Sequence, residues 1–130
     1  MHQGKISIIG GDNLLFVDPC NFTLLGKHPA GEYFGHEIES DGESIYIVNS
    51  SQSQITRYDG SEYSKHWRPQ FVTEDTHEDR CHLSGMCLDN GVPALVTSFS
   101  KTNAKQGWRI NKNSSGLVID VRTDEVLVEG

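Results

Sequence analysis

The chain has 130 residues, enough for one domain with a modest hydrophobic core. Hydrophobic residues make up 35% and charged residues 22%, a balance that excludes a disordered tail. The formal net charge is -7. Binding to nucleic acid or to an anionic membrane requires a basic face, so we expect neither partner.

The chain also lacks the segments that direct a protein into or across a membrane. No apolar run approaches the roughly 20 residues that span a bilayer. Residues 1–5 lack the apolar stretch of a signal peptide. Cys20, Cys81 and Cys87 are an odd number at spacings that match no standard pairing, so we expect free thiols in a reducing compartment. The sequence therefore predicts a cytoplasmic protein.

Short runs of strand-forming residues alternate with turn residues along the whole chain. We expect loops at residues 27–34 and 100–115, and a helical turn only within residues 73–80. In chain order, the predicted strands are residues 5–9, 14–17, 22–25, 36–39, 44–48, 54–58, 63–67, 82–88, 94–98, 117–121 and 125–128.

Two stretches repeat one pattern of strand, Asp-Gly turn and apolar strand. They begin at His36 and His82, which are 46 residues apart, within the repeat length of a propeller blade. A weaker copy of this pattern occurs earlier in the chain, with residues 10–13 (GGDN) as its turn. The turns predict an all-β fold, and the repeat favours a propeller over a sandwich. We therefore expect a β-propeller fragment of about two to three four-stranded antiparallel blades, approximately residues 1–34, 35–80 and 81–130. Because a blade must stack on neighbours to bury its faces, we expect missing blades or self-association.

Several rare residues fall in an order that resembles a bacterial family of conserved hypothetical proteins, a domain of unknown function. The resemblance covers roughly residues 35–130 and is carried by residues 36–38, 48–50, 67–71, 78–86, 96–98, 107–109 and 116–121. It implies a propeller of the gluconolactonase and senescence-marker-protein type, with longer members in which a further His-containing blade follows. Ser84 departs from the family, which usually has Asn there, so a role that needs an amide at this position is in doubt.

The first strand of each propeller blade lines the central channel, so His36 and His82 are expected at one level of it. The basic segment of residues 101–112 is either a lid over the channel mouth or a surface loop with its Trp tucked inward. We therefore predict a binding module for a small molecule or a protein. Its ligand-binding residues would be His36, Asn49, His82, Trp108 and Arg109.

The alternative is a metal-assisted hydrolase or lactonase-like enzyme that needs further blades or subunits. A divalent metal would then bind His36, Glu37 and His82, although strand alternation points Glu37 away from His36. The simpler interpretation is that each His bonds to neighbouring backbone.

Two further ideas concern the cysteines. Cys81 and Cys87 could hold zinc with His77 and His82, but Cys81 and His82 are adjacent and would face opposite ways in a strand. Cys81 as a nucleophile would need a base and a lowered pKa, and the alternative is a buried thiol that acts as a small hydrophobe.

Overall fold

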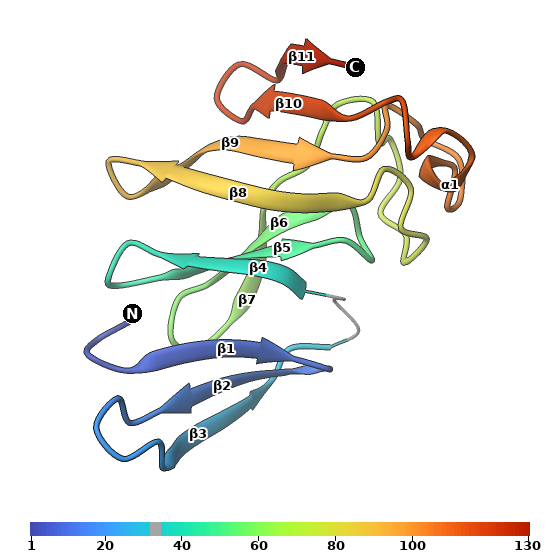
Figure 1. The fold of residues 1–130 in the computed structure, drawn as a ribbon. Helices are drawn as coiled ribbons and strands as arrows, with labels where there is room; N and C mark the ends of the chain where they lie inside the picture. Colours follow the sequence, from blue (N-terminus) through green and yellow to red (C-terminus); the bar gives the residue numbers. More distant parts are fainter. Residues whose placement is uncertain (32–34) are drawn as a thin grey trace.

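The computed structural model describes residues 1–31 and 35–130, which form three antiparallel sheets and one short helix (Figure 1). The first sheet contains β1 (Ile6–Gly10), β2 (Asn13–Val17) and β3 (Leu24–Pro29). The second contains β4 (Gly35–Ser40), β5 (Ile45–Asn49), β6 (Gln54–Tyr58) and β7 (Tyr63–Trp67). The third contains β8 (Leu83–Asp89), β9 (Val92–Ser98), β10 (Leu117–Asp120) and β11 (Glu125–Glu129), with α1 (Trp108–Asn111) between β9 and β10.

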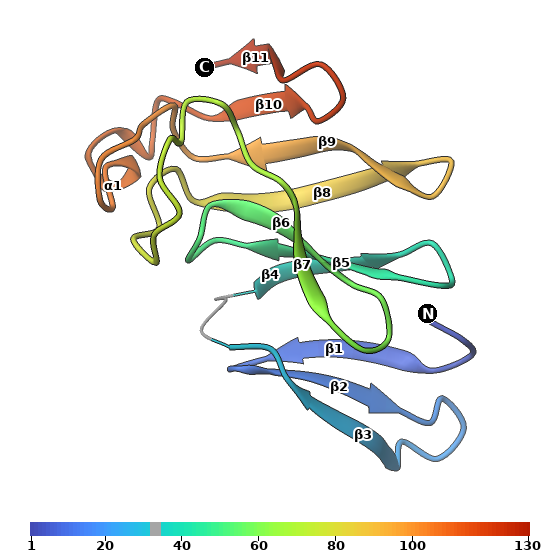
Figure 2. The same cartoon turned by 180° about the vertical axis from the view of Figure 1, so that it is seen from behind.

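Within each sheet, every strand pairs with the strands next to it in sequence. Short turns join most of these pairs, whereas the long segment that contains α1 joins β9 to β10. The sheets follow one another side by side, as the blades of a propeller do (Figures 1 and 2). The prediction of an all-β propeller fragment is confirmed. The first sheet has three strands among the described residues, where four were predicted.

The hydrophobic core lies in the two seams between the sheets. The seam between the first and second sheets buries Leu14, Phe16, Ile45, Ile47 and Tyr58. The larger seam between the second and third sheets is built mainly from alternate residues of β5, β8, β9 and β10. Each sheet is thus held by its neighbour, which explains why both faces of β5 are buried.

The strands β4 and β8 lie next to each other and begin at the same end of the molecule (Figure 1). The backbone N–H of Met86 in β8 donates a hydrogen bond to the carboxylate of Glu37 in β4. This bond joins the second and third sheets at their inner edges. It also brings the first residues of both strands to one place, where the candidate site forms.

Two local predictions were wrong. Residues 73–80 form no helix, and the helix lies instead at Trp108–Asn111, inside a predicted loop. The strand expected at residues 22–25 begins at Leu24, because Asp18 caps a longer turn in which Phe22 adopts a φ of 58°.

The outer face of the third sheet carries exposed and half-buried apolar side chains, including Leu95, Val118 and Val128. No other described element covers it. Its occupation by missing blades or by another copy stays a prediction. No helix among the described residues is long and apolar enough to cross a membrane.

Candidate functional site

The candidate site lies at the end of the molecule where β4 and β8 begin. Four segments meet there: the start of β4, the turn between β5 and β6, the connection from β7 to β8, and the segment around α1. They enclose a hollow of about 250 Å³. It is lined by His36, Ser51, His77, Glu78, Asp79, His82, Lys105, Gln106 and Arg109.

A column of stacked side chains forms one wall of the hollow. The ring centroids of His36 and His82 are 4.6 Å apart, in an edge-to-face arrangement. His82 stacks on Trp108 with centroids 4.1 Å apart, and the guanidinium carbon of Arg109 lies 4.4 Å from the centre of the Trp108 ring. Aromatic stacking and a cation over an indole both stabilise such a column. The structure thus brings together His36, His82, Trp108 and Arg109, four of the five predicted ligand-binding residues, and their binding of a ligand stays a prediction.

Asp79 fixes the orientation of this column. Its carboxylate oxygens both lie 2.9 Å from Nδ1 of His82, and Oδ2 accepts a hydrogen bond from Nε1 of Trp108 at 3.0 Å. Asp79 and His82 both adopt a positive φ, of 47° and 55°, which is costly for residues other than glycine. The backbone thus bends sharply so that both side chains meet Trp108.

The hollow carries cationic groups near its rim. Lys105 and Arg109 are exposed residues of the segment around α1. The pKa of His36 lies below its usual value, mainly because partial removal from water penalises the imidazolium, and secondly because His82 lies beside it.

The two carboxylates of the hollow already have partners. Glu78 bonds to the guanidinium of Arg80 at 2.8 Å, and this interaction holds the pKa of Glu78 below its usual range. Asp79 is taken up by His82 and Trp108. The acidic groups therefore have partners within the wall, whereas Lys105 and Arg109 are exposed at the rim.

Other predicted residues lie elsewhere or play a supporting part. Asn49 is fully buried, and its side chain bonds to Gln52 in the turn after β5 and to Thr56 in β6. Trp108 is buried behind His82 and does not line the hollow. Glu37 lines a separate hollow with Met86 on the face of the third sheet, so it does not meet His36.

The next two predictions concern a metal site and a reactive thiol. Among residues 1–31 and 35–130, no three His, Cys, Asp or Glu side chains are placed to hold a metal ion together. A metal site at His36, Glu37 and His82 stays a prediction. Burial raises the pKa of the Cys81 thiol to about 11, so the thiol is protonated at neutral pH.

Sequence reasoning missed Asp79 and Ser51. The spacing of Asp79 and His82 is a short signal for a carboxylate that orients an imidazole. Ser51 gave no signal, because it reaches the hollow only through the turn after β5, where its hydroxyl lies 3.1 Å from Nδ1 of His77.

A comparison with known protein families matches the part of the chain that forms the hollow. A family model described as Domain of unknown function (DUF4915) matches residues 19–130. The chain belongs to the DUF4915 family. The match spans both four-stranded sheets and therefore every residue that lines the hollow. No curated protein and no solved structure matches this DUF4915 chain, and nothing supports a relationship to gluconolactonase-type propellers.

Proposed function

We propose that this DUF4915 chain is a binding module whose hollow at the start of β4 and β8 takes a small anionic molecule. The observation that carries the proposal is the convergence of His36, His82 and Arg109, with Lys105, on one hollow. These residues come from three segments of the chain that only the fold brings together.

The preference for an anion follows from which charges are free to meet a ligand. Lys105 and Arg109 have exposed side chains that reach the rim, whereas Glu78 and Asp79 are held by Arg80, His82 and Trp108. Arg binds a carboxylate or a phosphate through paired N–H donors. Protonated imidazoles would add to the attraction.

The preference for a small molecule follows from the size and rigidity of the hollow. Its volume of about 250 Å³ is close to the lower limit of typical ligand sites. Its wall is preorganised, since Asp79 locks His82 against Trp108. A site ordered before the ligand arrives loses less entropy on binding.

The experiment is a calorimetric titration of the full chain with inorganic phosphate, succinate and glucose 6-phosphate. We expect at least one of them to bind, and Arg109→Gln to weaken its binding about tenfold, which corresponds to about 1.4 kcal/mol. Lys101→Gln is the matched control, because Lys101 is an exposed lysine of the same loop that does not line the hollow. It removes the same charge from the chain.

An equal loss of affinity in both variants would reduce the effect to net charge and contradict a specific site. Absence of binding by all three anions, with the fold intact by circular dichroism, would overturn the proposed ligand class.

A further inference from the structure

The hydrogen bonds of Asp79 determine which ring nitrogen of His82 carries a hydrogen. A carboxylate accepts hydrogen bonds and donates none, whereas a neutral imidazole has one N–H and one bare nitrogen. Both oxygens of Asp79 lie 2.9 Å from Nδ1 of His82. Nδ1 therefore carries the hydrogen and donates it to Asp79, and Nε2 of the neutral ring keeps a lone pair.

Aromatic rings on several sides hold His82 in this orientation. Trp108 stacks on it with centroids 4.1 Å apart, and the centroids of Phe99 and His36 lie 5.0 Å and 4.6 Å away. Nε1 of Trp108 also donates to Oδ2 of Asp79, so the carboxylate is held as well. The two nitrogens of His82 therefore cannot exchange places without breaking this network.

Among the described residues, Nε2 of His82 has no hydrogen-bond partner. It is not one of the polar atoms that are buried without a partner, so solvent reaches it. His82 lines the hollow, so a molecule that fills the hollow can meet this nitrogen. Such a molecule should offer Nε2 a hydrogen-bond donor, because displacing its water without replacing the bond costs affinity.

The charges at the rim favour one of the two donors that a small anion can carry, an ammonium or a hydroxyl. Lys105 and Arg109 repel an ammonium, whereas the carboxylates of the hollow already have partners. A hydroxyl donates without carrying a charge. Arg109 and His82 both lie against the indole of Trp108, so one small molecule can reach both.

We infer that the anion in the hollow is a small hydroxy acid, whose hydroxyl donates to Nε2 of His82 while a carboxylate pairs with Arg109. The inference rests on the proposed function, because it names the ligand class of the same hollow. Asp79 is the positioning residue, since it acts on the ligand through His82 by keeping Nε2 a bare acceptor. An analogue without the hydroxyl binds less well, because it leaves that nitrogen unpaired.

Asp79→Asn should reverse the roles of the two nitrogens. The indole N–H of Trp108 only donates, so it keeps the amide oxygen of the new side chain at the position of Oδ2. The amide NH₂ then takes the position of Oδ1, 2.9 Å from Nδ1 of His82, and donates to it. Nδ1 becomes the acceptor and Nε2 carries the hydrogen, so the ligand hydroxyl loses its acceptor.

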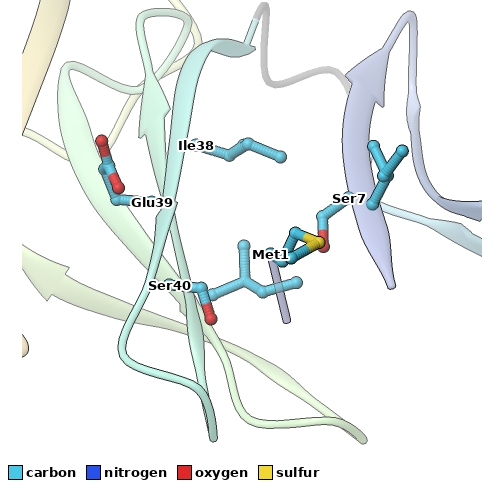
Figure 3. Close-up of a pocket in the computed structure, with 7 residues that line it drawn as sticks. Met1, Ser7, Ile38, Glu39 and Ser40 are labelled. Atoms are coloured by element: carbon cyan, nitrogen blue, oxygen red, sulfur yellow. The ribbon is translucent and has the colours of Figure 1, made fainter. Parts of the chain in front are cut away.

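A second cavity offers a competing place for the ligand. It has a volume of about 120 Å³ and lies between β1 and β4 (Figure 3). The buried hydroxyl of Ser7 lines it and has no hydrogen-bond partner among the described residues, so it is free to bond to a ligand hydroxyl. Of the described side chains that line this cavity, only that of Glu39 is charged, and it would repel an anion. The hollow beside His82 is therefore the better place for a hydroxy acid, and Ser7→Ala tests the other.

The test compares succinate with malate, which carry the same charge and differ by one hydroxyl. The full chain is titrated by calorimetry with succinate, L-malate and D-malate at about pH 8, where carboxyl groups are ionised and an ordinary imidazole is neutral. We expect the better enantiomer of malate to bind the wild type about tenfold more tightly than succinate, and Asp79→Asn to abolish this preference. Because the two acids have equal charge, the charge lost at Asp79 cancels in the ratio of affinities.

Asp12→Asn is the matched control. It makes the same change of charge at an exposed residue that does not line the hollow, so it should keep the preference for malate. Ser7→Ala should keep it as well.

Histidine ¹⁵N NMR spectra distinguish a positioning role of Asp79 from a purely structural one. The wild type should show a hydrogen on Nδ1 of His82 and none on Nε2, and Asp79→Asn should show the reverse. In the wild type, malate should shift the Nε2 resonance further than succinate does. This last measurement decides the matter even if Asp79→Asn fails to fold.

Equal affinities of malate and succinate for the wild type, or a preference that persists in Asp79→Asn, would overturn the inference and leave the anion site standing. A preference lost in Ser7→Ala would place the hydroxyl in the other cavity and also overturn it. So would tighter binding of L-aspartate than of malate, because the donor would then be an ammonium. If no binding of these acids or of the phosphates is detected, the proposed function itself fails, so the two failures are distinguishable.

Discussion

His36 and His82 lie edge to face with ring centroids 4.6 Å apart, although they are 46 residues apart in the chain. Two imidazoles at this distance cannot both carry a proton without repulsion, which is one reason why the pKa of His36 is lowered. The pair therefore couples the protonation of the site to the stability of the fold and, if the proposed function holds, to anion binding.

We expect the stability of the fold to fall as the pH drops below 6.5, the ordinary pKa of histidine. The pKa values of His2, His36 and His66 are all lowered, mainly by burial, so the unfolded chain takes up protons first. Their stabilisation is complete above pH 6.5 and is lost as the pH falls towards their folded-state pKa values. Melting temperatures between about pH 7.5 and pH 5 measure it, above the range in which carboxylates titrate.

Anion affinity should change in the opposite direction. It should rise as the pH falls through the pKa of His36, because a protonated imidazole attracts the ligand. His36→Asn should flatten the pH dependence of affinity, whereas His66→Asn, which changes a histidine of β7 outside the hollow, should not. Equal pH profiles in the wild type and His36→Asn would show that His36 does not meet the ligand.

Removing the indole N–H of Trp108 should weaken the Asp79 network while leaving an aromatic ring in place. Trp108→Phe keeps an aromatic ring beside His82 but removes the hydrogen bond to Asp79. We expect a loss of about 1 kcal/mol in the free energy of unfolding, measured with urea, and weaker anion binding. Trp67→Phe is the control, because Trp67 lies in the seam between the second and third sheets. A greater loss of anion affinity in Trp67→Phe would contradict the role of the Asp79 network.

Most strands could be predicted from the sequence, because their ends depend on local turns. Asp59 and Gly60 show this: a carboxylate that caps the backbone and a glycine with positive φ end β6 whatever surrounds them. The helix at Trp108–Asn111 could not be predicted in this way. It has no side-chain cap and one buried residue, and Trp108 is held by Asp79, 29 positions earlier.

The candidate site was predictable in part for the same reason. His36 and His82 were found because each begins an equivalent strand, and the repeat places such strands together. Asn49 ends β5, but the sequence did not reveal that Gln52 and Thr56 would bond to its amide. Contacts between residues far apart in the chain determine which side chains face the hollow, and local sequence patterns do not reveal these contacts.

The three cysteines should differ in reactivity. Cys20 and Cys87 are exposed, whereas Cys81 is buried and its pKa is raised to about 11 by removal from water. A disulfide reagent that colours on reaction, such as Ellman's reagent, should therefore modify Cys20 and Cys87 in the native protein and Cys81 only in denaturant. Rapid modification of Cys81 in the native chain would instead show a reactive thiol.

The seam between the first and second sheets should be sensitive to one added methyl group. A Cβ atom on Gly35, at the start of β4, would lie 2.5 Å from the side chain of Ile9, so the two sheets would have to separate there. We expect Gly35→Ala to lower the free energy of unfolding by about 1–3 kcal/mol, the usual cost of overpacking. Gly10→Ala is the matched control, because a Cβ on Gly10 meets nothing within 4 Å. Similar urea midpoints for the two variants would mean that the first sheet does not pack against β4 as closely as the contact of Ile9 with Gly35 requires.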